Sequence, residues 1–327
     1  MSEPCFPFSG KGRVVALCGG VGGAKLAAGL ARVLGEELVV IVNTADDFEH
    51  LGLAISPDID TVLYTLGGRA DKERGWGRAD ESWSFLRVLG ELGGETWFRL
   101  GDQDLALHVL RTQGLRAGRK LTAIVGEVAR RFDIRSTILP MSDDPIRTIV
   151  ETPEGDLAFQ RYFVERRCAP QVLGIRFDGA SGACASAQVR EALAAPSLRA
   201  IVVCPSNPYL SVDPILATAN IGTLIEAAQV PVVAVSPIIG GAAVKGPTTK
   251  IMRELGVPAT SKAIAQHYRG LIEGLVIDET DAAERDLPGV AVKVTRTLMR
   301  NDADRDRLAV EALAFADELA QKAKVSL

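Results

Sequence analysis

Short apolar runs alternate with stretches of helical spacing along most of the chain. The run 13–18 leads into glycines, residues 25–34 repeat apolar side chains with the period of a helix, and residues 38–42 form a second apolar run. Strand, glycine turn, helix and strand make a βαβ unit, because continuous apolar runs are typical of buried parallel strands. Further core strands are predicted at 200–204, 231–235 and 274–277. The pattern predicts an α/β fold with a Rossmann-like, doubly wound, mostly parallel sheet.

Two segments interrupt this alternation. Residues from about 57 to 132 look mainly helical, and we interpret them as a helical insertion. Residues from about 146 to 178 contain alternating polar and apolar positions around the turn 153–156, which predicts a small antiparallel β insertion. We therefore expect an N-terminal extension over 1–12 and a single α/β nucleotide-binding domain over 13–327.

The composition excludes several classes of protein. With 327 residues, 47% hydrophobic and 24% charged, the chain resembles an ordinary globular protein. A net charge of −4 offers no general basic surface, so we expect no nucleic-acid partner. No apolar run approaches the roughly 18 residues that span a bilayer, and the first residues lack the pattern of a signal peptide. We expect a cytoplasmic protein without a membrane partner.

The histidines and cysteines show no metal-binding pattern. The chain has 3 histidines and 5 cysteines, without a C-x-x-C pair or a zinc-ligand spacing. Free thiols are therefore predicted.

The glycine turn after the first strand is the most informative local motif. It contains Gly19, Gly20, Gly22 and Gly23 and is followed by Lys25. Glycines let a backbone approach a phosphate closely, and a helix N-terminus directs amides at it. The turn matches neither the P-loop nor the dinucleotide fingerprint, because Lys25 lacks the P-loop context and stands where the third glycine belongs. The alternative interpretation is a tight strand-to-helix turn without a ligand.

Acidic loops follow several of the predicted strands. Asp46 comes directly after the second strand, Asp58 and Asp60 follow shortly after, and Asp102 and Asp143 lie in two later turns. Carboxylate oxygens suit Mg²⁺, which usually takes one or two carboxylates together with substrate phosphates. Each aspartate could instead cap a neighbouring helix.

Two later strand ends carry further candidate ligands for a nucleotide. Ser206 and Asn207 follow the strand 200–204, and Ser236 and Gly240 lead towards Lys245. Short polar side chains, glycines and a lysine at strand ends suit a ribose or a phosphate. A local proline or Asx turn is the alternative for the first loop.

All three tryptophans, Trp76, Trp83 and Trp97, fall in one stretch that also contains Arg99. The rings either offer surface to a flat heterocycle or form a local core. Arg99 is either a charged donor in the same pocket or a surface arginine.

Taken together, these motifs resemble the 2-phospho-L-lactate transferase family of deazaflavin coenzyme biosynthesis, whose bacterial members act as phosphoenolpyruvyl transferases in making coenzyme F-420. Each motif is weak alone, but their order along the chain is specific. The motifs that carry the resemblance are Cys18–Leu26, Val42–Asp47, Ser56–Tyr64, Met141–Pro145, Cys204–Pro208 and Ser236–Gly241.

The resemblance implies a reaction and the residues that perform it. The ribityl hydroxyl of Fo, the 8-hydroxy-5-deazariboflavin precursor, would attack a guanosine diphosphate ester of enolpyruvate, lactate or glycerate, releasing GMP. By similarity, Asp60, Arg99 and Asp102 would bind Fo. Because such a transfer needs neutralisation of charge on the phosphate oxygens, we expect Asp46 or Asp60 to hold Mg²⁺ and both to act in catalysis. A homodimer is implied as well. The residues expected to bind the nucleotide and its phosphates are Gly19, Gly20, Gly22, Gly23, Lys25, Ser206, Asn207, Ser236, Gly240 and Lys245.

Two other functions remain open at the level of the sequence. The same glycine turn could serve a dinucleotide-dependent oxidoreductase, in which Asp46 would bind a ribose. A non-catalytic regulator that binds a nucleotide or a sugar through this fold is the second alternative. GMP release that depends on Fo and Mg²⁺ distinguishes the transferase from both.

Overall fold

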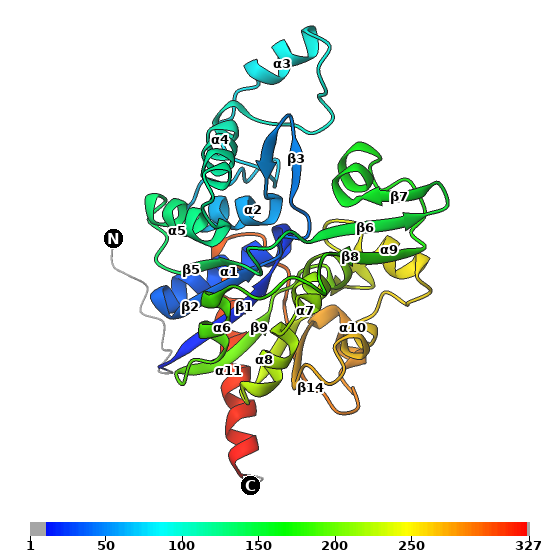
Figure 1. Ribbon diagram of the computed structural model, residues 1–327. Helices are drawn as coiled ribbons and strands as arrows, with labels where there is room; N and C mark the ends of the chain where they lie inside the picture. The colour runs from blue at the N-terminus through cyan, green and yellow to red at the C-terminus, as the bar shows by residue number, and fades with distance from the viewer. Residues whose placement is uncertain (1–10, 326–327) are drawn as a thin grey trace.

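The computed structural model describes residues 11–325, so residues 1–10 of the predicted N-terminal extension lie outside the described residues. Over this range the chain forms a seven-stranded sheet in the order β14-β13-β10-β9-β1-β2-β5, with every neighbouring pair parallel (Figure 1). The predicted parallel Rossmann-like sheet is confirmed. Its strands are β1 (Arg13–Cys18), β2 (Leu38–Val42), β5 (Thr137–Pro140), β9 (Leu198–Val203), β10 (Val232–Val235), β13 (Gly274–Asp278) and β14 (Ala291–Thr295).

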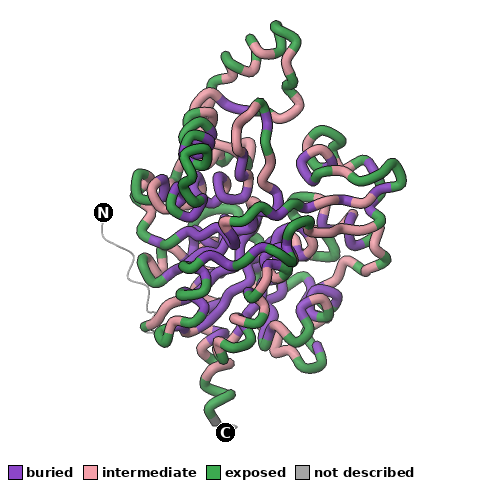
Figure 2. The backbone as a smooth tube through the Cα atoms, in the orientation of Figure 1, coloured by how far each residue is buried: buried purple, intermediate pink, exposed green. Residues whose placement is uncertain are grey.

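Helices cover both faces of this sheet, as expected of a doubly wound fold. Alternate side chains of β1 enter two different cores: Val14 and Ala16 pack in one, Val15 and Leu17 in the other. Both cores are fully buried (Figure 2). The first core is covered by α1 (Gly20–Leu34), α2 (Pro57–Leu66), α5 (Leu121–Arg131) and α11 (Asp302–Val325). The second is covered by α6 (Ala187–Leu193), α7 (Asp213–Ala217), α8 (Ile221–Ala227), α9 (Thr248–Glu254) and α10 (Ser261–His267).

The segment 57–132 contains α2, α3 (Ser84–Glu91), α4 (Asp102–Arg116) and α5. A short antiparallel hairpin, β3 (Phe48–His50) with β4 (Leu53–Ile55), precedes it and was not predicted. Its strands are too short for a periodic pattern. Figure 1 shows that α3 projects from the rest of the molecule, above α4 and β3.

The segment 146–178 forms an antiparallel sheet in the order β7-β6-β8. Its strands are β6 (Arg147–Thr152), β7 (Gly155–Ala158) and β8 (Gly174–Asp178), and β11 (Ile238–Ile239) pairs with β12 (Ala242–Ala243) elsewhere. The remaining short helical turns are η1 (Gly35–Glu37), η2 (Arg161–Glu165), η3 (Pro208–Val212) and η4 (Glu279–Glu284). Among the described residues, no helix combines the length and the apolar character needed to cross a membrane.

Candidate active site

The glycine turn packs against the loop that follows β9. The backbone N–H of Gly19 donates to Ser206 Oγ at 3.1 Å, and the Ser206 hydroxyl donates back to the Gly19 carbonyl at 2.8 Å. A Cβ at Gly22 would lie 2.6 Å from the Pro205 carbonyl oxygen, and one at Gly23 would lie 2.3 Å from Ser206 Oγ. Glycine is needed at these positions because the start of α1 touches the Pro205 backbone at Gly22 and the Ser206 side chain at Gly23.

Gly20 links the turn to the acidic segment of α2. Its φ is +63°, and a Cβ there would meet no described atom within 4 Å, so this side of the turn is open. Its N–H donates to Asp58 Oδ1 at 2.8 Å, while Asn43 Nδ2 donates to Asp58 Oδ2 at 3.0 Å. Two of the amides that were expected to bind phosphate, those of Gly19 and Gly20, are thus bound to protein side chains.

The two predicted lysines each donate to a backbone carbonyl that is distant in the sequence. Lys25 Nζ donates to the Met299 carbonyl at 3.0 Å, and Lys245 Nζ donates to the Gly75 carbonyl at 3.2 Å. Burial lowers the pKa of Lys25, and the charge of Lys245 lowers it further. Positive charge of this kind attracts an anion.

A group of buried carboxylates lies at the ends of β2 and β4. Burial raises the pKa of Asp46 well above its usual range, and the charge of Asp58 raises it further. Burial also raises the pKa of Asp58 to about 6 and that of Asp47 to about 7. Asp47 accepts a hydrogen bond from Ser56 Oγ at 2.7 Å through Oδ2. Carboxylates whose ionised form is disfavoured by burial favour a cation or a proton.

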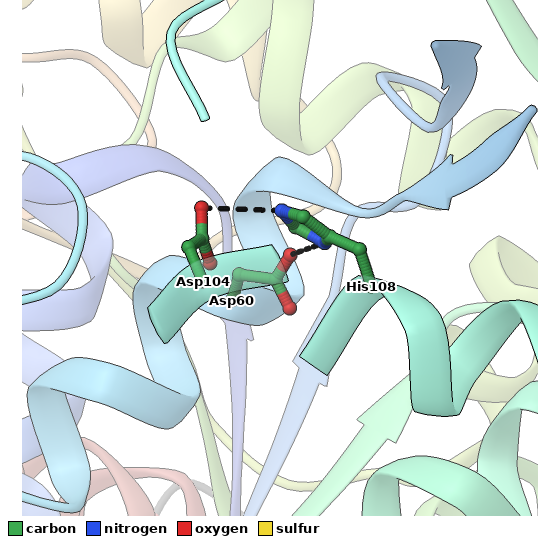
Figure 3. A group of neighbouring side chains, drawn as sticks. All are labelled: Asp60, Asp104 and His108. Carbon is green, nitrogen blue, oxygen red and sulfur yellow. Dashed lines mark ion pairs between the residues drawn. The ribbon is translucent and has the colours of Figure 1, made fainter. Parts of the chain in front are cut away.

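Asp60 belongs to a separate buried network between α2 and α4. The Arg111 guanidinium, 1% exposed, donates to both Asp60 oxygens, one of them at 3.1 Å. His108 lies between Asp60 and Asp104, with Nδ1 3.7 Å from Asp60 Oδ2 and Nε2 3.1 Å from Asp104 Oδ2 (Figure 3). Tyr64 donates to Asp104 through its hydroxyl.

This network could hold a metal ion. Asp60, Asp104 and His108 offer ligand atoms that all lie within 4.8 Å of one another. Burial raises the pKa of Asp60, while the charges of Arg111 and His108 oppose that rise. Sequence reasoning named Asp60 but missed its partners, although Asp104, His108 and Arg111 follow the spacing i, i+4 and i+7 of one helix face. That spacing was the available signal.

Arg99 and Asp102 lie in the projecting part of the helical segment. The Arg99 guanidinium stacks 4.8 Å from the Trp83 ring centroid and 6.0 Å from that of Trp76. Asp102 accepts hydrogen bonds from the N–H groups of Ser84 at 3.1 Å and Phe85 at 3.0 Å, so it caps α3. Asp143 likewise caps α5, through the N–H of Thr122 at 2.8 Å.

The tryptophans form no buried local core. Trp76 is 43% exposed. Trp97 packs with Phe48, His50 and Phe98 at centroid distances of 6.0, 5.0 and 5.8 Å. Aromatic surface is therefore available on both sides of the segment that contains Arg99.

The remaining predicted residues form hydrogen bonds that stabilise the loops in which they lie. Ser236 Oγ accepts from the N–H of Ile238 at 3.2 Å, and Gly240 N–H donates to Asp281 Oδ2 at 3.0 Å. Asn207 Oδ1 caps η3, whereas its buried Nδ2 has no hydrogen-bond partner among the described residues. This amide is a donor left over for a ligand.

The sheet and the groups at its carboxyl edge define an α/β protein with a candidate ligand site where the strand order reverses, between β1 and β9. The family model for 2-phospho-L-lactate transferase CofD matches residues 14–315. The chain therefore belongs to the CofD family and is a transferase of coenzyme F-420 biosynthesis. Among the functions that the sequence left open, family membership supports the transferase.

Relatives from bacteria and archaea cover nearly the whole chain. A phosphoenolpyruvate transferase of Kitasatospora aureofaciens is 40% identical over 94% of this chain and 98% of its own length. A 2-phospho-L-lactate transferase of Methanopyrus kandleri is 43% identical, again over 94% of this chain and 98% of its own. A Bacillus halodurans protein of the UPF0052 family has the same fold, with a TM-score of 0.59, 16% identity, and coverage of 93% of this chain and 100% of that one.

Proposed function

We propose that the chain transfers a phosphoenolpyruvyl or 2-phospholactyl group, with a 3-phosphoglyceryl group as a further candidate, from a guanosine diphosphate ester to the ribityl hydroxyl of Fo. The hydroxyl oxygen forms a bond to the phosphorus that carries the acid. The bond from that phosphorus to the bridging oxygen breaks, and GMP leaves with the bridging oxygen and its electron pair. The hydroxyl proton passes to a carboxylate. Such a transfer needs alignment and charge neutralisation rather than a covalent nucleophile.

The open side of Gly20, in a turn that packs against the β9 loop, is the observation that carries this proposal. A diphosphate needs positive charge on both phosphates, and the ammonium groups of Lys25 in α1 and Lys245 in the loop after β12 are the candidates that supply it. The open side of Gly20 leaves room for the donor to approach the turn. Asn207 Nδ2, buried and unpartnered among the described residues, is available to the donor from the β9 loop. Ser206, Ser236 and Gly240 support the donor site by holding their loops in place.

The acceptor lies, in this proposal, between the helical segment and the sheet edge. Trp83 and Trp76 offer ring faces to a flat heterocycle, and Arg99 stacks on both. Asp102 supports that surface because it fixes the start of α3, directly after Trp83. Asp60 would orient the ribityl hydroxyl, with Arg111 and His108 fixing its carboxylate.

The residue set fits Mg²⁺ at the buried carboxylates. Among the described residues, no positive charge opposes the rise in the pKa of Asp46 or Asp58. Burial disfavours the ionised form of both carboxylates, and a bound dication would stabilise that form. Asp60 is a poorer ligand as it stands, since Arg111 occupies both of its oxygens. We therefore propose Asp46 as the principal ligand, and Asp60 as a ligand only if Arg111 moves. A bound Mg²⁺ would neutralise charge on the phosphate oxygens.

The test is a transfer assay with Fo, Mg²⁺ and each of the three guanylylated acids, followed by mass analysis of the deazaflavin product. GMP release should require both Fo and Mg²⁺. Asp46→Asn is expected to lower turnover at least about a hundredfold and to weaken the Mg²⁺ dependence. The matched control is Asp143→Asn, which alters a carboxylate that caps α5. Absence of product with all three acids would remove the assignment, and binding of a guanine nucleotide without turnover would favour the regulator.

The family implies small-molecule substrates. We also propose that the chain acts as a homodimer.

A further inference from the structure

Asn43 follows β2 directly, and its buried side-chain amide has hydrogen-bond partners at both ends. Its Oδ1 accepts from the N–H of Ala45 at 2.9 Å. Its Nδ2 donates to Asp58 Oδ2 at 3.0 Å and to the Leu210 carbonyl at 3.2 Å. A backbone N–H can only donate and a carbonyl can only accept, so these partners allow the amide one orientation. Asn43 thus joins the end of β2 to segments 15 and 167 positions away in the sequence.

Both of these segments touch the glycine turn. In the sheet, β1 lies between β9 and β2, so a link from the end of β2 to the loop after β9 spans the strand that leads into the turn. Asp58 accepts from the N–H of Gly20. A Cβ at Gly19 would lie 2.6 Å from Asp58 Oδ2 and 2.6 Å from Cβ of Ser211 in η3. The Asn43 amide therefore fixes how the turn, α2 and η3 lie relative to one another.

The same amide bears on the orientation of Asn207. Asn207 Oδ1 accepts from the N–H groups of Tyr209 at 3.0 Å and Leu210 at 3.2 Å, which leaves its buried Nδ2 without a partner among the described residues. Asn207 thus holds the start of η3 through N–H groups, and Asn43 holds it through the Leu210 carbonyl. A change at Asn43 would displace the turn that carries the free Nδ2 of Asn207.

Replacement of Asn43 by an isosteric acid shows how strongly the segments depend on it. In Asn43→Asp, an oxygen takes the place of the Nδ2 that lies 3.0 Å from Asp58 Oδ2 and 3.2 Å from the Leu210 carbonyl oxygen. Two hydrogen bonds become two contacts between acceptors in a site that water does not reach. Relief of these contacts requires α2 or η3 to move away from the end of β2.

We propose that Asn43 is a positioning residue for the transfer reaction, whose amide holds the glycine turn and Asn207 at the separation that suits one donor diphosphate. The inference rests on the proposed function, because it concerns how the guanosine diphosphate ester is held. Asn43 is 0% exposed and so acts through Asp58 and Leu210 rather than by contact with a substrate.

The first experiment separates positioning from stability, with GDP as the probe for the donor site. At a temperature where circular dichroism shows the proteins folded, Asn43→Ala and Asn43→Asp should each bind GDP about tenfold more weakly and lower kcat at least about tenfold, with KM for Fo within about twofold of the parent value. In Asn43→Ala, hydrogen exchange at the amide of Gly20 should be about tenfold faster. The amide of Thr122, which Asp143 caps, should exchange as in the parent.

The matched control is Ser136→Ala. Ser136 is 4% exposed and donates to the Gly35 carbonyl at 2.8 Å, directly before β5 and thus at the opposite edge of the sheet. Its loss removes a buried hydrogen bond and should lower the urea midpoint while GDP affinity and kcat stay at the parent values. If Asn43→Asp fails to fold, Asn43→Ala carries the same comparison, because it introduces no contact between acceptors.

The second experiment reverses the bond between Asn43 and Asp58. In the double variant Asn43→Asp/Asp58→Asn, the amide introduced at position 58 donates to the carboxylate introduced at position 43, and its oxygen still accepts from Gly20. GDP affinity, measured without Mg²⁺ so that metal binding at Asp58 plays no part, should return to within about threefold of the parent value. Recovery stays incomplete because the contact with the Leu210 carbonyl remains unfavourable.

The outcomes distinguish this inference from the proposed function. A parent chain that neither binds GDP nor releases GMP in the transfer assay would refute the proposed function and the role of Asn43 with it. An active parent whose two Asn43 variants keep its GDP affinity and kcat would refute the positioning role alone. A double variant that binds GDP no better than Asn43→Asp would show that Asn43 does not act through Asp58, against the proposal.

Discussion

The ion pair between Asp60 and Arg111 allows catalysis to be separated from stability. Asp60→Asn leaves the Arg111 guanidinium, which is 1% exposed, without a charged partner. Breaking a buried pair from one side costs about 3–5 kcal/mol, because the remaining charge stays desolvated. This loss by itself would lower the amount of folded enzyme, so low activity in the single variant is ambiguous.

The double variant Asp60→Asn/Arg111→Met removes both charges together. Replacing a buried ion pair by groups of similar volume is often neutral, so we expect the unfolding free energy to return to within about 1–2 kcal/mol of the parent value. Urea unfolding of the parent, both single variants and the double variant measures this recovery. Arg111→Met alone should raise the pKa of Asp60, because the Arg111 charge is the main group that opposes its rise.

Turnover measured on the same four proteins decides the role of Asp60. If its carboxylate orients the attacking hydroxyl, turnover stays at least about a hundredfold below the parent in the double variant although stability recovers. Leu313→Ala serves as the control for stability, because it removes a fully buried side chain of α11 and costs about 2–5 kcal/mol away from the site. The Leu313→Ala variant should unfold at a lower urea concentration than the parent protein, yet show the parent turnover rate at low temperature. Recovery of turnover together with stability in the double variant would refute the catalytic role.

Three further predictions follow from single contacts. Gly22→Ala should lower the free energy of unfolding by about 1–3 kcal/mol, because the new Cβ would lie 2.6 Å from the Pro205 carbonyl oxygen. Urea unfolding measures this loss, and an unchanged midpoint would contradict the close packing. Asp102→Ala should uncap α3 at a cost of about 1 kcal/mol and raise the KM for Fo more than it lowers kcat; hydrogen exchange at Phe85 reports the uncapping, and unchanged exchange would count against it. Because burial raises the pKa of Asp47 to about 7, the folded state holds a proton that the unfolded chain releases above about pH 4. Stability should fall as pH rises through this window, and Asp47→Asn should remove about 4 kcal/mol of that fall; parallel pH profiles for the two proteins would exclude it.

The parallel sheet was predictable because its strands carry a strong local signal. Strands β1, β2, β9 and β10 are continuous apolar runs, and both of their faces are buried. Strand β14 was missed because it lies at the sheet edge, where its five half-buried residues form no continuous apolar run.

The site was less predictable because its contacts join distant positions. Asp58 was expected to bind a metal or cap the helix that follows, yet its carboxylate accepts from Gly20 at the start of α1. Arg111 carries no local sign that it pairs with Asp60, 51 positions earlier. The capping alternative was right for Asp102 and Asp143, but the N–H groups of Ser84 and Thr122 that they cap lie 18 and 21 positions before them. Local motifs identify the candidate site residues, but tertiary packing determines which hydrogen-bond and ion-pair partners they have.

The hydrogen bond from Gly20 to Asp58 couples the glycine turn to the buried carboxylates directly. Lys25 follows the turn in α1 and carries positive charge, whereas burial disfavours the ionised forms of Asp46 and Asp58. In the proposed reaction the diphosphate and the attacking hydroxyl need these different environments close together. A shift of the turn would therefore displace, at the same time, both groups of residues that we propose as substrate partners.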